Sequence, residues 1–185
     1  AHSLEEKHDE AGQFLARLYA TTDRIDDARE VLDELPSDAR VLYALAELES
    51  GAVGQGLPGA QDTAALRRYR DRLGAVLAAS PANLAVRLEL ANVQARRGMA
   101  DSVTIELEEI RRQRPEPPRE AQPLLDATLA ALRQRRAAEA RPTLDRFIEA
   151  MKLTSPYQAA LEHVKWVEGP LVGRPVLAFN PQTLI

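Results

Sequence analysis

Two prolines that lie 34 residues apart, Pro81 and Pro115, frame the most regular pattern in the chain. Apolar residues recur between them at helical spacing, in two runs that Gly98 separates. The runs contain Leu84, Leu88, Ala91 and Ala95, and then Val103, Leu107 and Ile110. Glycine readily adopts the left-handed backbone that ends many helices. The pattern therefore predicts two paired helices, Leu84–Arg96 and Asp101–Arg112, with Asp101 as the N-cap of the second.

The composition favours helices throughout the chain. Alanine, leucine and arginine are the commonest residues, whereas aromatic residues make up only 4% of the 185. An apolar fraction of 45% is enough to build a substantial core. We therefore predict an all-α fold.

The offsets of the helix pair recur twice upstream. In the first copy, Leu15-Ala16 correspond to Leu90-Ala91, and Asp23 takes the place of Gly98. In the second copy, Leu45-Ala46 take that position, but the distance to the next copy is longer than 34 residues. The excess falls on residues 50–62, which include the glycine-rich sequence SGAVGQGLPG. We interpret residues 50–62 as a loop inserted in the turn of one helix pair.

The unit that ends at Pro115 resembles a tetratricopeptide repeat. Numbered from Leu84, Leu90-Ala91 fall on the family's seventh and eighth positions, Gly98 on the fifteenth and Pro115 on the thirty-second. The unit departs from the family at the twentieth position, where Val103 replaces the usual alanine. The resemblance covers residues 9–115. It implies an α-solenoid of antiparallel helix pairs.

The pattern degrades after Pro115. A helix is expected over Arg119–Arg136, and Pro142 is expected in the first turn of the next helix. Ser155 and the following proline predict the start of a further helix that ends at Gly169. We interpret 119–168 as one degenerate repeat followed by a capping helix.

The last segment, 169–185, has a different character from the repeat domain at 1–168. Three prolines prevent a continuous helix there, so an extended tail or linker is expected. Its apolar residues Val176, Leu177 and Phe179 are candidates for contact with a partner. The tail could instead pack on its own domain, or lead into a β-rich domain.

The residues that catalysis and metal binding require are scarce. The chain has no Cys and three His, and His2 and His8 are not spaced to face the same side of a helix. The acidic pairs Asp26-Asp27 and Glu108-Glu109 are neighbours in sequence, so they point in different directions on a helix. No phosphate-binding loop is recognisable. We predict that the protein is not an enzyme and has no cofactor or metal.

Charge and hydropathy limit the partners. Residues 1–60 carry 13 acidic and 5 basic residues, whereas 61–141 carry 11 acidic and 15 basic ones. The bases are interleaved with acids and lack aromatic neighbours, so nucleic-acid binding is not expected. The apolar runs are too short to span a bilayer, and direct membrane insertion is not expected either. The expected partner is another protein.

The family resemblance also implies a binding surface, the concave groove lined by the first helix of each pair. The groove positions correspond here to Gln13, Arg17, Arg40, Tyr43, Glu47, Leu88 and Asn92. Some family members bind a terminal carboxylate with an asparagine and a lysine, but the lysine position holds Leu88 here. Arg17 and Tyr43 are the preferred candidates, because Arg and Tyr are enriched at binding hot spots.

Two functions are compatible with these features. The first is a non-catalytic scaffold that binds a partner peptide or helix, as part of a larger bacterial complex. The second is a regulatory or targeting module of a longer enzyme or β-domain protein whose catalytic part lies outside this chain. The absence of Cys slightly favours an extracytoplasmic location, periplasmic or secreted.

Overall fold

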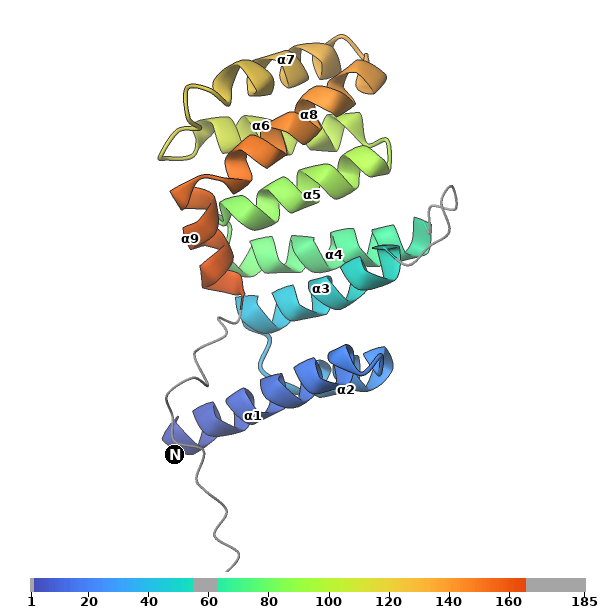
Figure 1. Ribbon diagram of the computed structural model, residues 1–185, viewed down its shortest axis with the longest axis vertical. Coiled ribbons are helices and arrows are strands. Elements are labelled where there is room, and N and C mark those ends of the chain that lie inside the picture. The colour runs from blue at the N-terminus through green and yellow to red at the C-terminus, as the bar shows by residue number, and fades with distance from the viewer. Residues whose placement is uncertain (1, 55–62, 166–185) are drawn as a thin grey trace, which may run out of the picture.

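The computed structural model describes residues 2–54 and 63–165, and these residues form helices and no strands (Figure 1). The prediction of an all-α fold is confirmed for this part of the chain. The helices are α1 (His2–Thr21), α2 (Ile25–Glu34), α3 (Ala39–Gly54), α4 (Thr63–Ala79), α5 (Leu84–Arg96), α6 (Ala100–Arg112), α7 (Gln122–Arg133), α8 (Ala137–Lys152) and α9 (Ser155–Val164).

The first eight helices form four packed pairs: α1–α2, α3–α4, α5–α6 and α7–α8. The second helix of each pair also contacts the first helix of the next pair, so the pairs follow one another along the long axis of the molecule (Figure 1). The expected pairing of adjacent helices is thus confirmed. Most apolar side chains of these helices are buried where helices meet, but Phe14, Leu15 and Leu18 of α1 are exposed.

The three helix-pair turns within the described residues share the same geometry. Asp23, Gly98 and Arg135 have positive φ angles of 62°, 72° and 58°. In each turn, the next residue donates its N–H to a carbonyl five residues back, at 2.9 Å: Arg24 to Tyr19, Met99 to Gln94, and Arg136 to Ala131. This is the hydrogen-bond pattern of a Schellman motif. The predicted correspondence between Asp23 and Gly98 is therefore confirmed in backbone geometry.

The two helices of the best-matched unit lie close to their predicted bounds. α5 covers Leu84–Arg96 as predicted, and α6 begins at Ala100. Asp101 is therefore in the first turn and is not the N-cap, a position that Met99 occupies without a side-chain hydrogen bond. Asp101 still lies where a negative charge favours the helix dipole.

The predicted loop insertion and the last helices differ from expectation. Residues Ser50–Gly54, predicted to be loop, continue α3, and 55–62 lie outside the described residues. α7 is shorter than expected, at Gln122–Arg133. α8 begins at Ala137, so Pro142 lies inside the helix and not in its first turn. Proline can occupy that position only where the loss of one backbone donor is tolerated.

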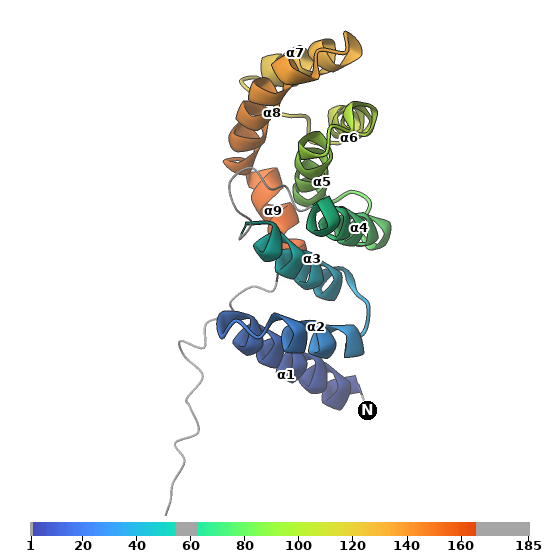
Figure 2. The ribbon, with the colours of Figure 1, turned by 90° about the vertical axis from the view of Figure 1, so that its right-hand side faces the viewer.

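Helix α9 begins and ends differently from the prediction. Its N-cap is Thr154 instead of Ser155, because the Thr154 hydroxyl accepts a hydrogen bond from the Tyr157 N–H at 3.3 Å. The helix ends at Val164, before the predicted stop at Gly169. It also does not cap the far end of the stack. Instead, α9 packs against α5, α3 and α8, alongside the stacked pairs (Figure 2).

The core consists of three clusters along the stack. The largest joins α5 and α6 to α7, α8 and α9 around Phe147, and the second joins α3, α4 and α5. Val164 of α9 belongs to this second cluster and is fully buried. The third and smallest cluster lies between the first pair and α3, around Leu32 and Leu45. This sparsely filled junction is where the candidate site lies.

Candidate functional site

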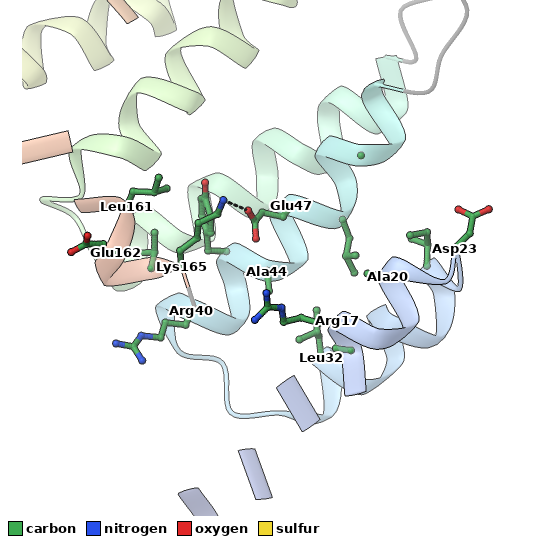
Figure 3. Close-up of a pocket in the computed structure, with 16 residues that line it drawn as sticks. Arg17, Ala20, Asp23, Leu32, Arg40, Ala44, Glu47, Leu161, Glu162 and Lys165 are labelled. Carbon is green, nitrogen blue, oxygen red and sulfur yellow. Dashed lines mark ion pairs between the residues drawn. The ribbon is translucent and has the colours of Figure 1, made fainter. Parts of the chain in front are cut away.

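A cavity of about 830 Å³ lies between the first helix pair, α3 and the C-terminal end of α9 (Figure 3). Its apolar lining consists of Ala16, Ala20, Ile25, Leu32, Ala44, Leu48, Leu161 and Val164. The charged residues Arg17, Asp23, Arg40, Glu47, Glu162 and Lys165 also contribute to the lining. The cavity is large enough for several side chains of a bound peptide.

The cavity exists because the helices that face each other carry small residues there. On α1, Ala16 and Ala20 are four residues apart and share one face. On α3, Arg40, Ala44 and Glu47 follow the same helical spacing along one face. Alanine side chains fill little of the space between two helices, whereas leucines in the same places would close it.

Two polar contacts attach α3 to the end of α9 at the edge of the cavity. Lys165 Nζ forms an ion pair with Glu47 Oε1 at 3.1 Å (Figure 3). Each of the two side chains is about half exposed. Arg40 Nε donates a hydrogen bond to the carbonyl oxygen of His163 at 3.3 Å. A cation suits this position, because the last carbonyls of a helix carry a partial negative charge. Arg40 and Glu47 therefore contact the C-terminal end of α9 in the same chain.

Helix α9 packs against the face of α5 that carries the predicted groove residue Leu88. Asn83, the N-cap of α5, accepts from the Val86 N–H and donates its Nδ2 to the Ala160 carbonyl oxygen at 2.7 Å. Leu88 is fully buried in the same cluster as Tyr157. The expectation that Leu88 contacts a partner is therefore not supported, since its side chain has no exposed surface.

Asn92, another predicted groove residue, is covered by α8. Its Oδ1 accepts a hydrogen bond from Arg141 Nη2 at 2.9 Å. Arg141 also pairs with Asp145 one turn later, at 2.9 Å. The inner face of α5, which the family resemblance assigned to a partner, is thus occupied by α8 and α9 of the same chain.

Tyr43 lies in the cavity wall, but its hydroxyl points into the core. It donates a hydrogen bond to Glu89 Oε1 at 2.8 Å, and the Tyr69 hydroxyl donates to Glu89 Oε2 at 3.1 Å. Burial raises the pKa of Glu89 above its usual range, although the two hydrogen bonds lower it. Burial likewise raises the pKa of Tyr43. Tyr43 therefore has a structural role in joining α3 to α5.

The structure brings together four of the predicted groove residues: Arg17, Arg40, Tyr43 and Glu47 all line the cavity. Gln13 is partly buried on α1 and is not in the lining. The predicted tail contacts Val176, Leu177 and Phe179 lie outside the described residues.

The contribution of α9 to the cavity, in particular that of Leu161 and Lys165, was not predicted from the sequence. Contacts between residues more than 100 positions apart leave no periodic signal in a single sequence. Glu89 was also missed, although a signal for it did exist. Glu89 stands between Leu88 and Leu90 in a run rich in apolar residues, so a carboxylate there needs a hydrogen-bond partner.

The site offers apolar and charged groups that suit binding. Within residues 2–54 and 63–165, no group of His, Asp and Glu side chains is placed to hold a metal ion. None of the helices in these ranges combines the length and apolar composition that crossing a membrane requires. The cavity is lined by apolar side chains and by charged side chains of both signs.

Comparisons with known proteins give no assignment. No protein-family model matches the chain, and no curated protein or solved structure is significantly similar to it. The cavity and its surroundings are therefore the basis for a functional proposal.

Proposed function

We propose that this protein is a non-catalytic scaffold that binds an amphipathic helix or short peptide of a protein partner in the cavity between α1 and α3. The repeated Schellman turns support the further inference that the helix pairs form a tetratricopeptide-like solenoid. In such an array, the surface inside the curve is the usual place for a ligand segment.

The packing of α9 is the observation that carries the proposal. Tyr157, Leu161 and Val164 lie at positions i, i+4 and i+7, and this stripe faces α5 and α3. That spacing is how an amphipathic helix enters an apolar groove. The inner surface thus already accommodates one helix, and the cavity extends this surface beyond the end of α9 toward α1.

The lining indicates the chemistry of the partner segment. A stripe of apolar side chains would cover Ala20, Ala44 and Leu48, and desolvating them would supply most of the binding energy. Polar groups beside the apolar stripe would contact the Glu47–Lys165 ion pair at the edge of the cavity. Charges at the edge of an interface contribute mainly to specificity.

The proposal can be tested by selecting peptides from a random display library on the full chain and measuring their affinity for two variants. Ala44→Arg places a long cation in the cavity, whereas the matched control Ala127→Arg changes an exposed alanine of α7. Cavity-binding peptides should lose at least tenfold in affinity for Ala44→Arg and bind the control like the unchanged protein. Circular dichroism and thermal unfolding would verify that both variants fold.

A selection that yields only peptides with equal affinity for Ala44→Arg and the control would contradict the proposal. Tyr43 is unsuitable for this test despite its position in the wall. Its hydroxyl bonds to Glu89, so removing the side chain would disturb the core as well as the cavity.

A further inference from the structure

We propose that the segment after α9, beginning at Trp166, occupies the cavity in the free protein and competes with the partner for it. The competition between this segment and a partner rests on the proposed function. The contact between the segment and the cavity does not. The occupant is part of this chain, and three observations favour it: where the chain leaves α9, the apolar character of the segment, and the shape of the cavity.

The chain leaves α9 at the edge of the cavity. Leu161, Val164 and Lys165 all contribute to its lining, so the last described residues are already at the site. The backbone of Lys165 is extended, with φ of −74° and ψ of 136°, which ends the helix there. The Glu47–Lys165 ion pair holds this exit point against α3. The next residue in the chain therefore starts beside the cavity.

The sequence of the segment suits an apolar site. Residues 166–185 contain one acidic and one basic residue, Glu168 and Arg174, so their charges cancel. The segment is otherwise rich in large apolar residues, including Trp166, Leu171 and Phe179. Twenty residues reach about 66 Å when extended, at about 3.3 Å per residue, which is more than enough to cross a cavity of this size.

The cavity lacks the bulk that the segment would supply. Ala16, Ala20 and Ala44 leave space between α1 and α3, and a tryptophan side chain is the largest that the chain has to fill it. Leaving this apolar lining in water costs free energy that a covering aromatic ring recovers. Trp166 is the first residue after the exit point, so we assign it as the anchor of the contact.

Tethering makes even a weak contact effective. A short tether gives an effective concentration of about 1 mM, so a segment with an intrinsic Kd of about 0.1 mM would fill the cavity about 90% of the time. A partner would then bind about tenfold more weakly than to an open cavity.

The test uses the fluorescence of Trp166, which is the only tryptophan in the chain. In the 185-residue chain, its emission should be blue-shifted and less quenched by acrylamide than that of a free peptide with the sequence of 166–185. Ala44→Arg and Ala20→Arg, which obstruct the cavity from two different helices, should each shift the emission toward that of the free peptide. The control Ala127→Arg should leave it unchanged.

The inference is overturned if Trp166 in the 185-residue chain behaves like the free peptide. It is also overturned if the emission is blue-shifted but insensitive to both cavity variants, because Trp166 would then be buried elsewhere. Comparing Ala20→Arg with Ala44→Arg guards against a local folding defect at one position.

A second measurement separates this inference from the proposed function. Trp166→Ala in the full chain should increase the affinity of cavity-binding peptides about tenfold. If Trp166 is shielded by the cavity but no selected peptide is sensitive to Ala44→Arg, the self-contact holds and the proposed function fails. If such peptides exist but Trp166 is solvent-exposed and Trp166→Ala does not change their affinity, the proposed function holds and the self-contact is rejected.

Discussion

Glu89 is a partly buried acidic residue where α3, α4, α5 and α9 meet. Two tyrosine hydroxyls, from α3 and α4, hold its oxygens, and the charges of Glu47 and Lys165 act on it from α3 and α9. Burial is the largest influence on its pKa and raises it. The folded protein therefore binds this proton more tightly than the unfolded chain does.

The raised pKa of Glu89 predicts how stability depends on pH. The stabilisation from a protonated Glu89 is complete below the unfolded pKa of about 4.5 and is lost as the pH rises through the higher folded pKa. Glu89→Gln cannot ionise, so its unfolding free energy should exceed that of the unchanged protein by a margin that grows with pH. Above the folded pKa, this margin is about 1.4 kcal/mol for every tenfold difference in proton affinity between the folded and unfolded states. Urea unfolding from pH 4 to 7 measures it.

An exposed glutamate provides the control. Glu120→Gln should leave the pH dependence of unfolding unchanged. If the difference between Glu89→Gln and the unchanged protein stays constant across the pH range, burial does not raise this pKa and the description of the Glu89 site is wrong.

Individual residues could be predicted where a local rule governs them. Gly98 and Asp23 were placed correctly because a turn between paired helices needs a residue that tolerates positive φ. Tyr43 was expected to contact a partner, but its side chain is buried and its hydroxyl binds Glu89. The direction of its hydroxyl depends on Glu89, 46 residues away, and no local rule connects the two.

At the scale of the elements, the turn between two helices determines how the helix pair forms. Gly98 has a φ of 72°, so an L side chain there is strained even though an added Cβ would meet no atom within 4 Å. Gly98→Ala should therefore lower the free energy of unfolding by about 1 kcal/mol, the cost of a left-handed residue with a side chain.

Gly74 is the matched control for this substitution. It lies in α4, and an added Cβ there would also meet no atom within 4 Å, but its backbone is helical. Gly74→Ala should raise the unfolding free energy by about 0.5–1 kcal/mol. The two alanines should thus act in opposite directions in urea unfolding. Equal effects of the same sign would show that the turn geometry at Gly98 is not as described.

The bounds of the elements were predictable only where periodicity was strong. α5 was predicted correctly because its apolar residues and its glycine stop agree. The predicted start of α8 is wrong, because proline favours the first turn of a helix but Pro142 lies inside this one. Thr154 and Ser155 are both good N-caps, and only the hydrogen bond to Tyr157 distinguishes them.

For the molecule as a whole, the main departure from a simple stack is the position of the last two helices. The sequence predicted a cap over the last pair, but α8 contacts α5 and α9 contacts α5 and α3. A single sequence reveals which face of α9 is apolar but not which partner covers that face. The sequence could therefore indicate paired helices and an inner binding surface, but not that the chain itself covers part of this surface and leaves only a cavity near α1.

The position of α9 against α3 is the central claim, and carbodiimide cross-linking tests it directly. The reagent joins an amine to a carboxylate in contact, and the chain has only three lysines. The Lys152–Glu149 pair within α8, at 2.8 Å, is an internal control that needs only local structure. We predict a Lys165–Glu47 link in the native protein that disappears in denaturant. A native sample that yields the Lys152–Glu149 link without the Lys165–Glu47 link would contradict it.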